Sequence, residues 1–295
     1  MTMSKMITIS NGYLSAVIDE KGAQLTSLRT AENSYIYNDL AVWPKHAPVL
    51  FPFAGRLYEQ KFLYDGREYG PVQIHGFAPY ADYSSEELTD HSVRMKMIVS
   101  DEIRRIWPFT FGFSVLFTLR DKTLFVTYRV ENKGDRAMYY GIGSHPGFNV
   151  PLKAGLAFED YFVEFPEAGT VVRHEMSDVC LTTGRTAPYS EIRGKRIPLR
   201  HDLFDHDAVI LSGTGKTAVI ATDRDSCKVI VTFPETQYCA LWHKVRMEVP
   251  FLCIEPWTSL PGFDHELTSL EKKRDYNVLK PASFREHHLN ITIME

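Results

Sequence analysis

A glutamate and a histidine stand out because their chain neighbours hold them in apolar or constrained surroundings. Glu255 lies in the otherwise apolar segment CIEPW, residues 253–257, where a carboxylate is costly unless it is paired or lines a cleft. Burial raises the pKa of a carboxyl group, and a carboxylate tuned in this way can serve as a general base. His145 lies in GIGSHPGFN, residues 141–149, where three glycines and a proline constrain the backbone. An imidazole held in one place is suited to general acid–base catalysis.

Three further side chains could bind a polyhydroxylated ligand. Trp257 follows Glu255 by two residues, so the two side chains share a face if the segment is a strand. An indole beside a carboxylate suits a sugar, because the C–H face of the ring packs on the aromatic while the hydroxyls meet polar groups. Arg56 ends the apolar stretch of HAPVLFPFAGRL, and His75 precedes a glycine in IHGF. We expect both to project from strand ends.

The segment LFDHDAVIL, residues 203–211, adds two carboxylates, Asp205 and Asp207, just before another apolar run. Together with the histidines, the arginine and the glutamate, such a group can hold a sugar and move protons. The sequence has no GxSxG nucleophile elbow, so serine hydrolase chemistry has no support. It also lacks HxH and HExxH spacing, so no metal site is predicted.

These residues are compatible with three classes of protein. The first is an acid–base enzyme. The second is a non-catalytic sugar-binding protein, which would keep Trp257 and a polar cleft but would not need both Glu255 and His145. The third is a metal-dependent enzyme with His75, His145 and Glu255 as ligands. The presence of both Glu255 and His145 favours the first class, and metal analysis of the purified protein would test the third.

Strands must position these side chains, because strand-like segments dominate the sequence. The segments FTFGFSVLFTLR (109–120) and TLFVTYRVEN (123–132) are rich in aromatic and β-branched residues and are separated by a polar turn at 120–122. They predict an antiparallel hairpin. Later apolar runs recur at short, regular spacing with turn residues between them, which is typical of a sandwich or barrel. We therefore expect an all-β protein with one large antiparallel domain over residues 1–295.

Three regional predictions complete this organisation. The opening strand-like segment at 6–18 and the terminal ITI at 291–293 could pair with each other. Residues 265–273, HELTSLEKK, could form a short helix. The polar stretch 166–202 is interpreted as loops between strands.

Composition excludes several partners and cellular settings. The chain has 295 residues, 44% of them hydrophobic, and a formal net charge of -4. Nothing in this balance suggests nucleic acid or an anionic membrane, since both call for a basic surface. The N-terminal segment is too polar for a signal peptide and no apolar run approaches the roughly 20 residues of a membrane span, so we expect a cytoplasmic protein. The four cysteines form no CxxC pair and are expected to be buried, reduced thiols.

Five segments, taken in order, resemble the aldose 1-epimerase (galactose mutarotase) family, most closely its shorter, LacX-like members: HAPVLFPFAGRL, IHGFAPY, GIGSHPGFNVP, LFDHDAVIL and CIEPW. The resemblance runs from about residue 5 to the C-terminus. It implies a galactose mutarotase-like supersandwich, a large β-sandwich with an open cleft for a monosaccharide. It also implies that no cofactor is required, and we expect a monomer or a homodimer.

The resemblance also implies a role for each matched residue in the interconversion of α and β anomers of a hexose. Glu255 matches the family's base and His145 its acid. The substrate-binding positions fall on Arg56, His75, Trp257 and an aspartate of 203–211, for which Asp207 is preferred and Asp205 is the alternative. A hexose 6-phosphate is an alternative substrate.

Two departures from the family pattern lie near the expected cleft. Many relatives read HGFAR where this chain reads HGFAP, with Pro79 in place of the arginine. Relatives often have a glycine soon after the tryptophan of CIEPW, whereas this chain continues as TSLPGF and reaches its first glycine at Gly262. Both differences bear on which sugar is bound.

Overall fold

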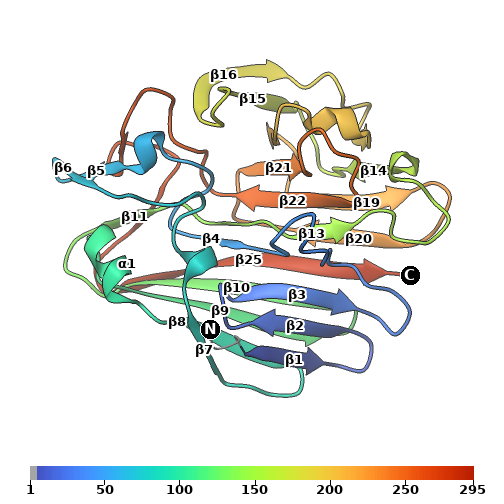
Figure 1. The fold of residues 1–295 in the computed structure, drawn as a ribbon, viewed down its shortest axis with the longest axis horizontal. Helices are drawn as coiled ribbons and strands as arrows, with labels where there is room; N and C mark the ends of the chain where they lie inside the picture. Colours follow the sequence, from blue (N-terminus) through green and yellow to red (C-terminus); the bar gives the residue numbers. More distant parts are fainter. Residues whose placement is uncertain (1–4) are drawn as a thin grey trace.

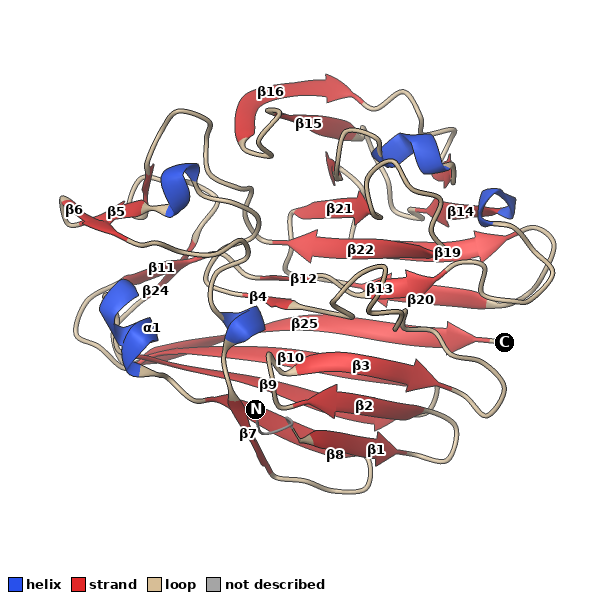
Figure 2. Ribbon diagram, viewed as in Figure 1, coloured by secondary structure: helices blue, strands red, loops and turns tan. Residues whose placement is uncertain are grey.

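Strands dominate the computed structural model, which describes residues 5–295, as the alternating apolar pattern predicts (Figure 1, Figure 2). Two large sheets carry most of them. Nine strands form one sheet, in the order β17 (Arg196–Pro198), β14 (Tyr161–Glu164), β19 (Thr217–Thr222), β20 (Lys228–Thr232), β25 (Ser283–Met294), β10 (Thr123–Asn132), β9 (Phe111–Arg120), β8 (Ser92–Met97) and β7 (Tyr83–Glu86).

The second large sheet carries the segments that the sequence marks as chemically interesting. Its order is β16 (Thr182–Pro188), β15 (Val172–Met176), β18 (Val209–Ser212), β21 (Tyr238–Trp242), β22 (Phe251–Trp257), β12 (Gly143–Ser144) and β4 (Val49–Leu50), and β13 (Gly147–Asn149) also pairs with β22. Strand pairing within both large sheets is antiparallel wherever the structure describes it. The all-β, antiparallel fold class is thereby confirmed.

Smaller elements surround the two large sheets. Three small sheets comprise β1 (Met6–Ser10), β2 (Ser15–Asp19) and β3 (Gln24–Arg29); β23 (Thr268–Ser269), β5 (Phe62–Tyr64) and β6 (Arg67–Tyr69); and β11 (Met138–Tyr140) with β24 (Asn277–Leu279). The helical elements in the described chain are α1 (Asp101–Ile106) and the short 3-10 turns η1 (Tyr58–Gln60), η2 (Ala78–Tyr80), η3 (Phe158–Asp160) and η4 (His201–Phe204). None of these helices is long and apolar enough to cross a membrane.

The predicted hairpin is confirmed, whereas three regional predictions are wrong. Strands β9 and β10 pair over their full lengths around a two-residue turn. The two ends of the described chain do not pair with each other, because β1 pairs with β2 while β25 lies between β10 and β20. Residues 166–202 contain β15, β16 and β17. Their side chains are mostly half-exposed, so no apolar run marks them.

Residues 265–273 form a β-bridge and turns instead of a helix. Thr268 pairs with Phe62 in β5, and the Leu270 N–H donates to the Leu63 carbonyl at 3.0 Å. A helix of nine residues has little stability of its own, and this pairing buries Leu270 completely. The α-helix occurs at 101–106 instead, where Ser100 caps it by accepting from the Ile103 N–H.

One apolar core fills the space between the large sheets and positions the site. Its buried residues run from Ile7 to Ile293 along the chain. In β22, Leu252 and Ile254 belong to this core, whereas Cys253, Glu255 and Trp257 point to the opposite face. The period-2 alternation of a strand thus separates the side chains that hold the sheet from those that are available to a ligand.

Candidate active site

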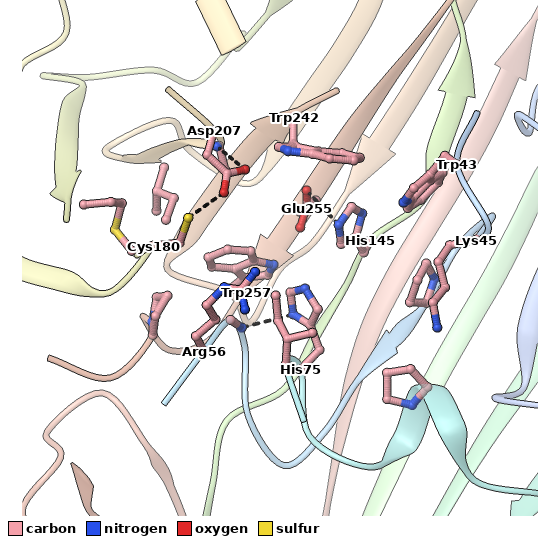
Figure 3. Close-up of a pocket in the computed structure, with 18 of the residues that line it drawn as sticks. Trp43, Lys45, Arg56, His75, His145, Cys180, Asp207, Trp242, Glu255 and Trp257 are labelled. Carbon is pink, nitrogen blue, oxygen red and sulfur yellow. Dashed lines mark hydrogen bonds and ion pairs between the residues drawn. The ribbon is translucent and has the colours of Figure 1, made fainter. Parts of the chain in front are cut away.

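A cavity opens on the outer face of the eight-stranded sheet, above β22 (Figure 3). Its lining includes every site residue predicted from the sequence except the alternative aspartate: Arg56, His75, His145, Asp207, Glu255 and Trp257. These side chains come from positions spread over 200 residues of the chain. Glu255 and Trp257 both face the cavity, as the strand interpretation of CIEPW predicts.

Glu255 and His145 form a close pair at the floor of the cavity. The His145 Nε2 lies 3.2 Å from the Glu255 Oε1, and the two residues are 8% and 1% exposed. Trp43 and Trp242 pack against the imidazole, with ring centroids 5.2 and 5.6 Å away. The pair is therefore enclosed by apolar rings and shielded from bulk water.

Burial shifts the two pKa values of this pair in opposite directions. It raises the pKa of Glu255 well above its usual range, the negative charge of Asp207 adds to the rise, and the indole of Trp257 opposes it. Burial also lowers the pKa of His145 well below its usual range, and His75 lowers that pKa further. Both shifts favour the uncharged form of each side chain.

Two glycines explain why His145 lies in a glycine-rich segment. Gly143 pairs with both Leu50 and Trp257, and a Cβ at position 143 would lie 2.7 Å from the Trp257 Cδ1. At position 147 a Cβ would lie 2.7 Å from the ring of Trp43. Both distances are shorter than van der Waals contact allows, so glycine is needed for the segment to lie flat against these rings. His145 is carried between them, at the join of β12 and β13.

His75 is fixed by the backbone of a neighbouring loop. The Gly55 N–H donates to the His75 Nδ1 at 3.0 Å, and the His75 N–H donates to the Gly55 carbonyl at 2.9 Å. Because Nδ1 accepts, the proton of the neutral ring is on Nε2. Burial, with the charges of Arg56 and Lys45, lowers the His75 pKa to about 3. His75 is therefore a neutral residue that offers one N–H donor.

Arg56 and His75 lie in loops, not at strand ends as predicted. Strand β4 ends at Leu50, and the following Pro52 and Gly55 interrupt regular pairing before Arg56 is reached. The loop is nevertheless well anchored, since the Phe51 ring stacks on Phe113 of the opposite sheet with centroids 4.6 Å apart. Packing in the core thus fixes a loop that carries a ligand-facing cation.

The two candidate aspartates differ in position. Asp207 lines the cavity, and its carboxylate accepts the Ala208 N–H at 2.9 Å and the Cys180 thiol at 2.7 Å. Asp205 ends the short η4 turn and is absent from the described lining of the cavity. Asp207 also has a positive φ of 75°, a strained conformation for a non-glycine residue.

Sequence reasoning missed several residues of the lining, among them Trp43, Lys45, Cys180 and Trp242. Cys180 was expected to be buried like the other three cysteines, but it is only half-buried, because it lies in the turn between β15 and β16 at the cavity mouth. The two tryptophans offered a usable signal, since large aromatics close to a charged site are common in sugar-binding clefts.

Three groups in the described chain could hold a metal ion. Donor atoms of His145, Cys253 and Glu255 lie within 4.8 Å of one another. This differs from the set that the metal-dependent alternative requires, which includes His75, whose Nδ1 is occupied by the Gly55 N–H. Burial raises the pKa of the Cys253 thiol well above its usual range, so a metal bound there would have to displace the thiol proton.

Comparisons with known proteins agree with this geometry. The model of a family described as aldose 1-epimerase matches residues 5–278. The plasmid-encoded protein LacX of Lactococcus lactis subsp. lactis is 29% identical over 98% of this chain and 99% of its own length. A galactose mutarotase-like protein from Lactobacillus casei superposes with a TM-score of 0.92 at 29% identity, over 98% of this chain and 100% of that one. A galactose mutarotase related enzyme from Lactobacillus acidophilus also gives 0.92, at 30% identity over 99% and 98% of the two chains.

Proposed function

This chain belongs to the aldose 1-epimerase family, and we propose that it interconverts the α and β anomers of a hexose by acid–base catalysis. The observation that carries the proposal is the Glu255–His145 pair, 3.2 Å apart in an aromatic-walled cavity. Ring opening needs a proton acceptor at O1 and a proton donor at O5. Both oxygens are bonded to the anomeric carbon, so one close pair of side chains can serve both.

The reaction uses the single proton that the pair shares. The neutral acid–imidazole pair and the carboxylate–imidazolium ion pair contain the same number of protons, so one transfer across the 3.2 Å contact interconverts them. In the ion-pair form Glu255 accepts the O1 proton and the C1–O1 double bond forms. The C1–O5 bond breaks as that double bond forms, and His145 donates its proton to O5.

Closure on the other face regenerates the pair. After ring opening Glu255 is protonated and His145 is neutral, which is the charge state that burial favours. Rotation about C1–C2 turns the other face of the aldehyde toward O5. His145 then removes the O5 proton as O5 attacks C1, and Glu255 returns a proton to O1. No electrons are gained or lost, so the steps balance without a co-reactant.

The remaining side chains of the site would hold the sugar in position for proton transfer to Glu255 and from His145. Trp257 offers an apolar face, and its buried indole N–H has no regular hydrogen-bond partner among the described residues. His75 offers an Nε2–H donor, Arg56 a cation and Asp207 an acceptor, each from a different segment. Holding the substrate in one orientation raises the effective concentration of the acid and base.

Polarimetry tests the proposal directly. Freshly dissolved α-D-glucose and α-D-galactose are followed with the wild-type protein and with Glu255→Gln side by side. We expect the wild-type protein to accelerate the approach to equilibrium for at least one sugar, and the variant to lose this effect. A wild-type protein that binds either sugar without accelerating the change would instead identify a non-catalytic carbohydrate-binding protein.

A further inference from the structure

Lys45 lies in the cavity without an anionic partner. It is half-buried, and burial lowers its pKa from the usual 10.5. Its Nζ lies 4.3 Å from the centroid of the Tyr80 ring, and no carboxylate of the described residues comes within 4.0 Å of it. Lys273, by contrast, is also buried but is paired with Asp275 at 2.9 Å. A partly desolvated cation without an anion is costly, which a bound anion would offset.

The cavity holds a second cation besides Lys45. Arg56 is a second lining cation without a carboxylate partner among the described residues. The lining carboxylates in the described chain are Asp207, whose oxygens are taken by Cys180 and Ala208, and Glu255. Burial raises the pKa of Glu255 well above its usual range. A site with two free cations, in a chain whose formal net charge is -4, is suited to attract an anionic ligand.

The position of Lys45 indicates which part of a sugar it would meet. Figure 3 shows Lys45 on the His145 side of His75, and Arg56 on the Trp257 side. The charge of Lys45 acts on both imidazoles, consistent with this placement. In the proposed reaction His145 faces O5 and Glu255 faces O1. Since O5 is bonded to C5, which bears C6, the C6 substituent lies on the side of His145 away from O1, where Lys45 is.

We propose that Lys45 makes this cavity selective for hexoses that carry an anionic group, phosphate or carboxylate, on C6. This inference rests on the proposed function, because the placement of C6 follows from His145 at O5. A charge-assisted hydrogen bond between the ammonium group and the anion would be formed with such substrates and absent with neutral hexoses. The stacking of Lys45 on Tyr80 keeps the ammonium group in place for this contact.

The test measures anomer exchange by NMR, after subtraction of the uncatalysed rate, for glucose, glucose 6-phosphate and glucuronate. The galactose series is measured in parallel. We expect kcat/KM of the wild-type protein to be about 10- to 100-fold higher for an anionic sugar than for its neutral counterpart. Preference for the phosphate or for the uronate identifies the anion. Lys45→Met should lose this advantage, and Lys45→Arg should retain most of it.

A matched control separates a local contact from a change in overall charge. Lys228 is exposed at the start of β20 and does not line the cavity, so Lys228→Met should leave every rate unchanged. Equal kcat/KM for neutral and anionic sugars in the wild-type protein, or an equal loss for both in Lys45→Met, would overturn the inference. If no sugar is turned over, the proposed function fails. In that case calorimetry tests the inference separately. Binding of glucose 6-phosphate or glucuronate that depends on Lys45 would support the inference, and binding of neither sugar would overturn it.

Discussion

The Glu255→Gln substitution separates catalysis from folding at the most buried polar position of the cavity. Glutamine keeps the size and hydrogen-bonding capacity of the side chain but cannot accept the O1 proton. A positioned general base contributes about 10²- to 10⁴-fold. We therefore expect kcat to fall by that factor, equivalent to about 3 to 5 kcal/mol of activation free energy. Anomer exchange is measured by NMR at saturating sugar.

The same substitution should not reduce the stability of the fold. The folded-state pKa of Glu255 is raised above its ordinary value of 4.5. The stability that this residue contributes is therefore complete below pH 4.5 and is lost as the pH rises through the raised folded pKa. Glutamine has no proton to lose, so above pH 4.5 the variant should be at least as stable as the wild-type protein.

Thermal unfolding at pH 4 and pH 8 accompanies the kinetic measurement. Glu248→Gln serves as a control, because Glu248 is exposed in the turn region before β22 and its loss should change neither activity nor Tm. A folded Glu255→Gln protein that retains turnover within about threefold of wild type would refute the base assignment. A Tm that falls at pH 8 would refute the argument that burial raises the pKa of Glu255.

Three further substitutions test the remaining parts of the site. His145→Asn should lower kcat by about 10²- to 10⁴-fold with little change in sugar Kd, and equal losses in both would argue for a binding role. Cys180→Ala removes the thiol that donates to Asp207 at 2.7 Å, so KM should rise about two- to tenfold and Cys180→Ser should restore it; an unchanged KM would show that Asp207 needs no such partner. The His75 pKa is depressed from 6.5 to about 3, so its contribution to stability is present above pH 6.5 and is lost as the pH falls toward 3. The free energy of unfolding, measured with urea, should therefore depend less on pH in that range in His75→Gln than in the wild-type protein. An unchanged pH dependence would contradict the depressed pKa of His75.

The central strands could be predicted because their sequences alternate clearly. Strands β9 and β10 bury every second residue along most of their length. The outward-facing Glu255 and Trp257 could be paired on one face by the same period-2 rule. Strand partners could not be predicted in this way, since alternation shows which face is buried but not which strand lies alongside. That is why β25 was expected to pair with the N-terminal segment.

The walls of the cavity were the hardest part to foresee. Lys45 and Cys180 lie in turns whose local sequence carries no periodic signal, and they reach the site only because distant strands bring the turns together. The hairpin of β15 and β16 was missed for a related reason. The side chains of β15 are half-exposed and most of those of β16 are exposed, so neither an apolar run nor an alternation marks the hairpin. Such elements are specified by tertiary contacts more than by local propensity.

The division of the site between strands and turns has an evolutionary consequence. Glu255 and His145, the proposed acid–base pair, rest on β22 and on the join of β12 and β13, which the apolar core supports from beneath. Arg56 and Cys180 come from separate turns, and Lys45 comes from the loop whose His46 and Pro48 carbonyls accept the Gly147 and His145 N–H groups. Turns accept substitution and changes of length far more readily than a packed sheet does. Proteins that evolve from this fold can therefore acquire new sugar preferences by changes in these turns alone, while the acid–base pair is retained.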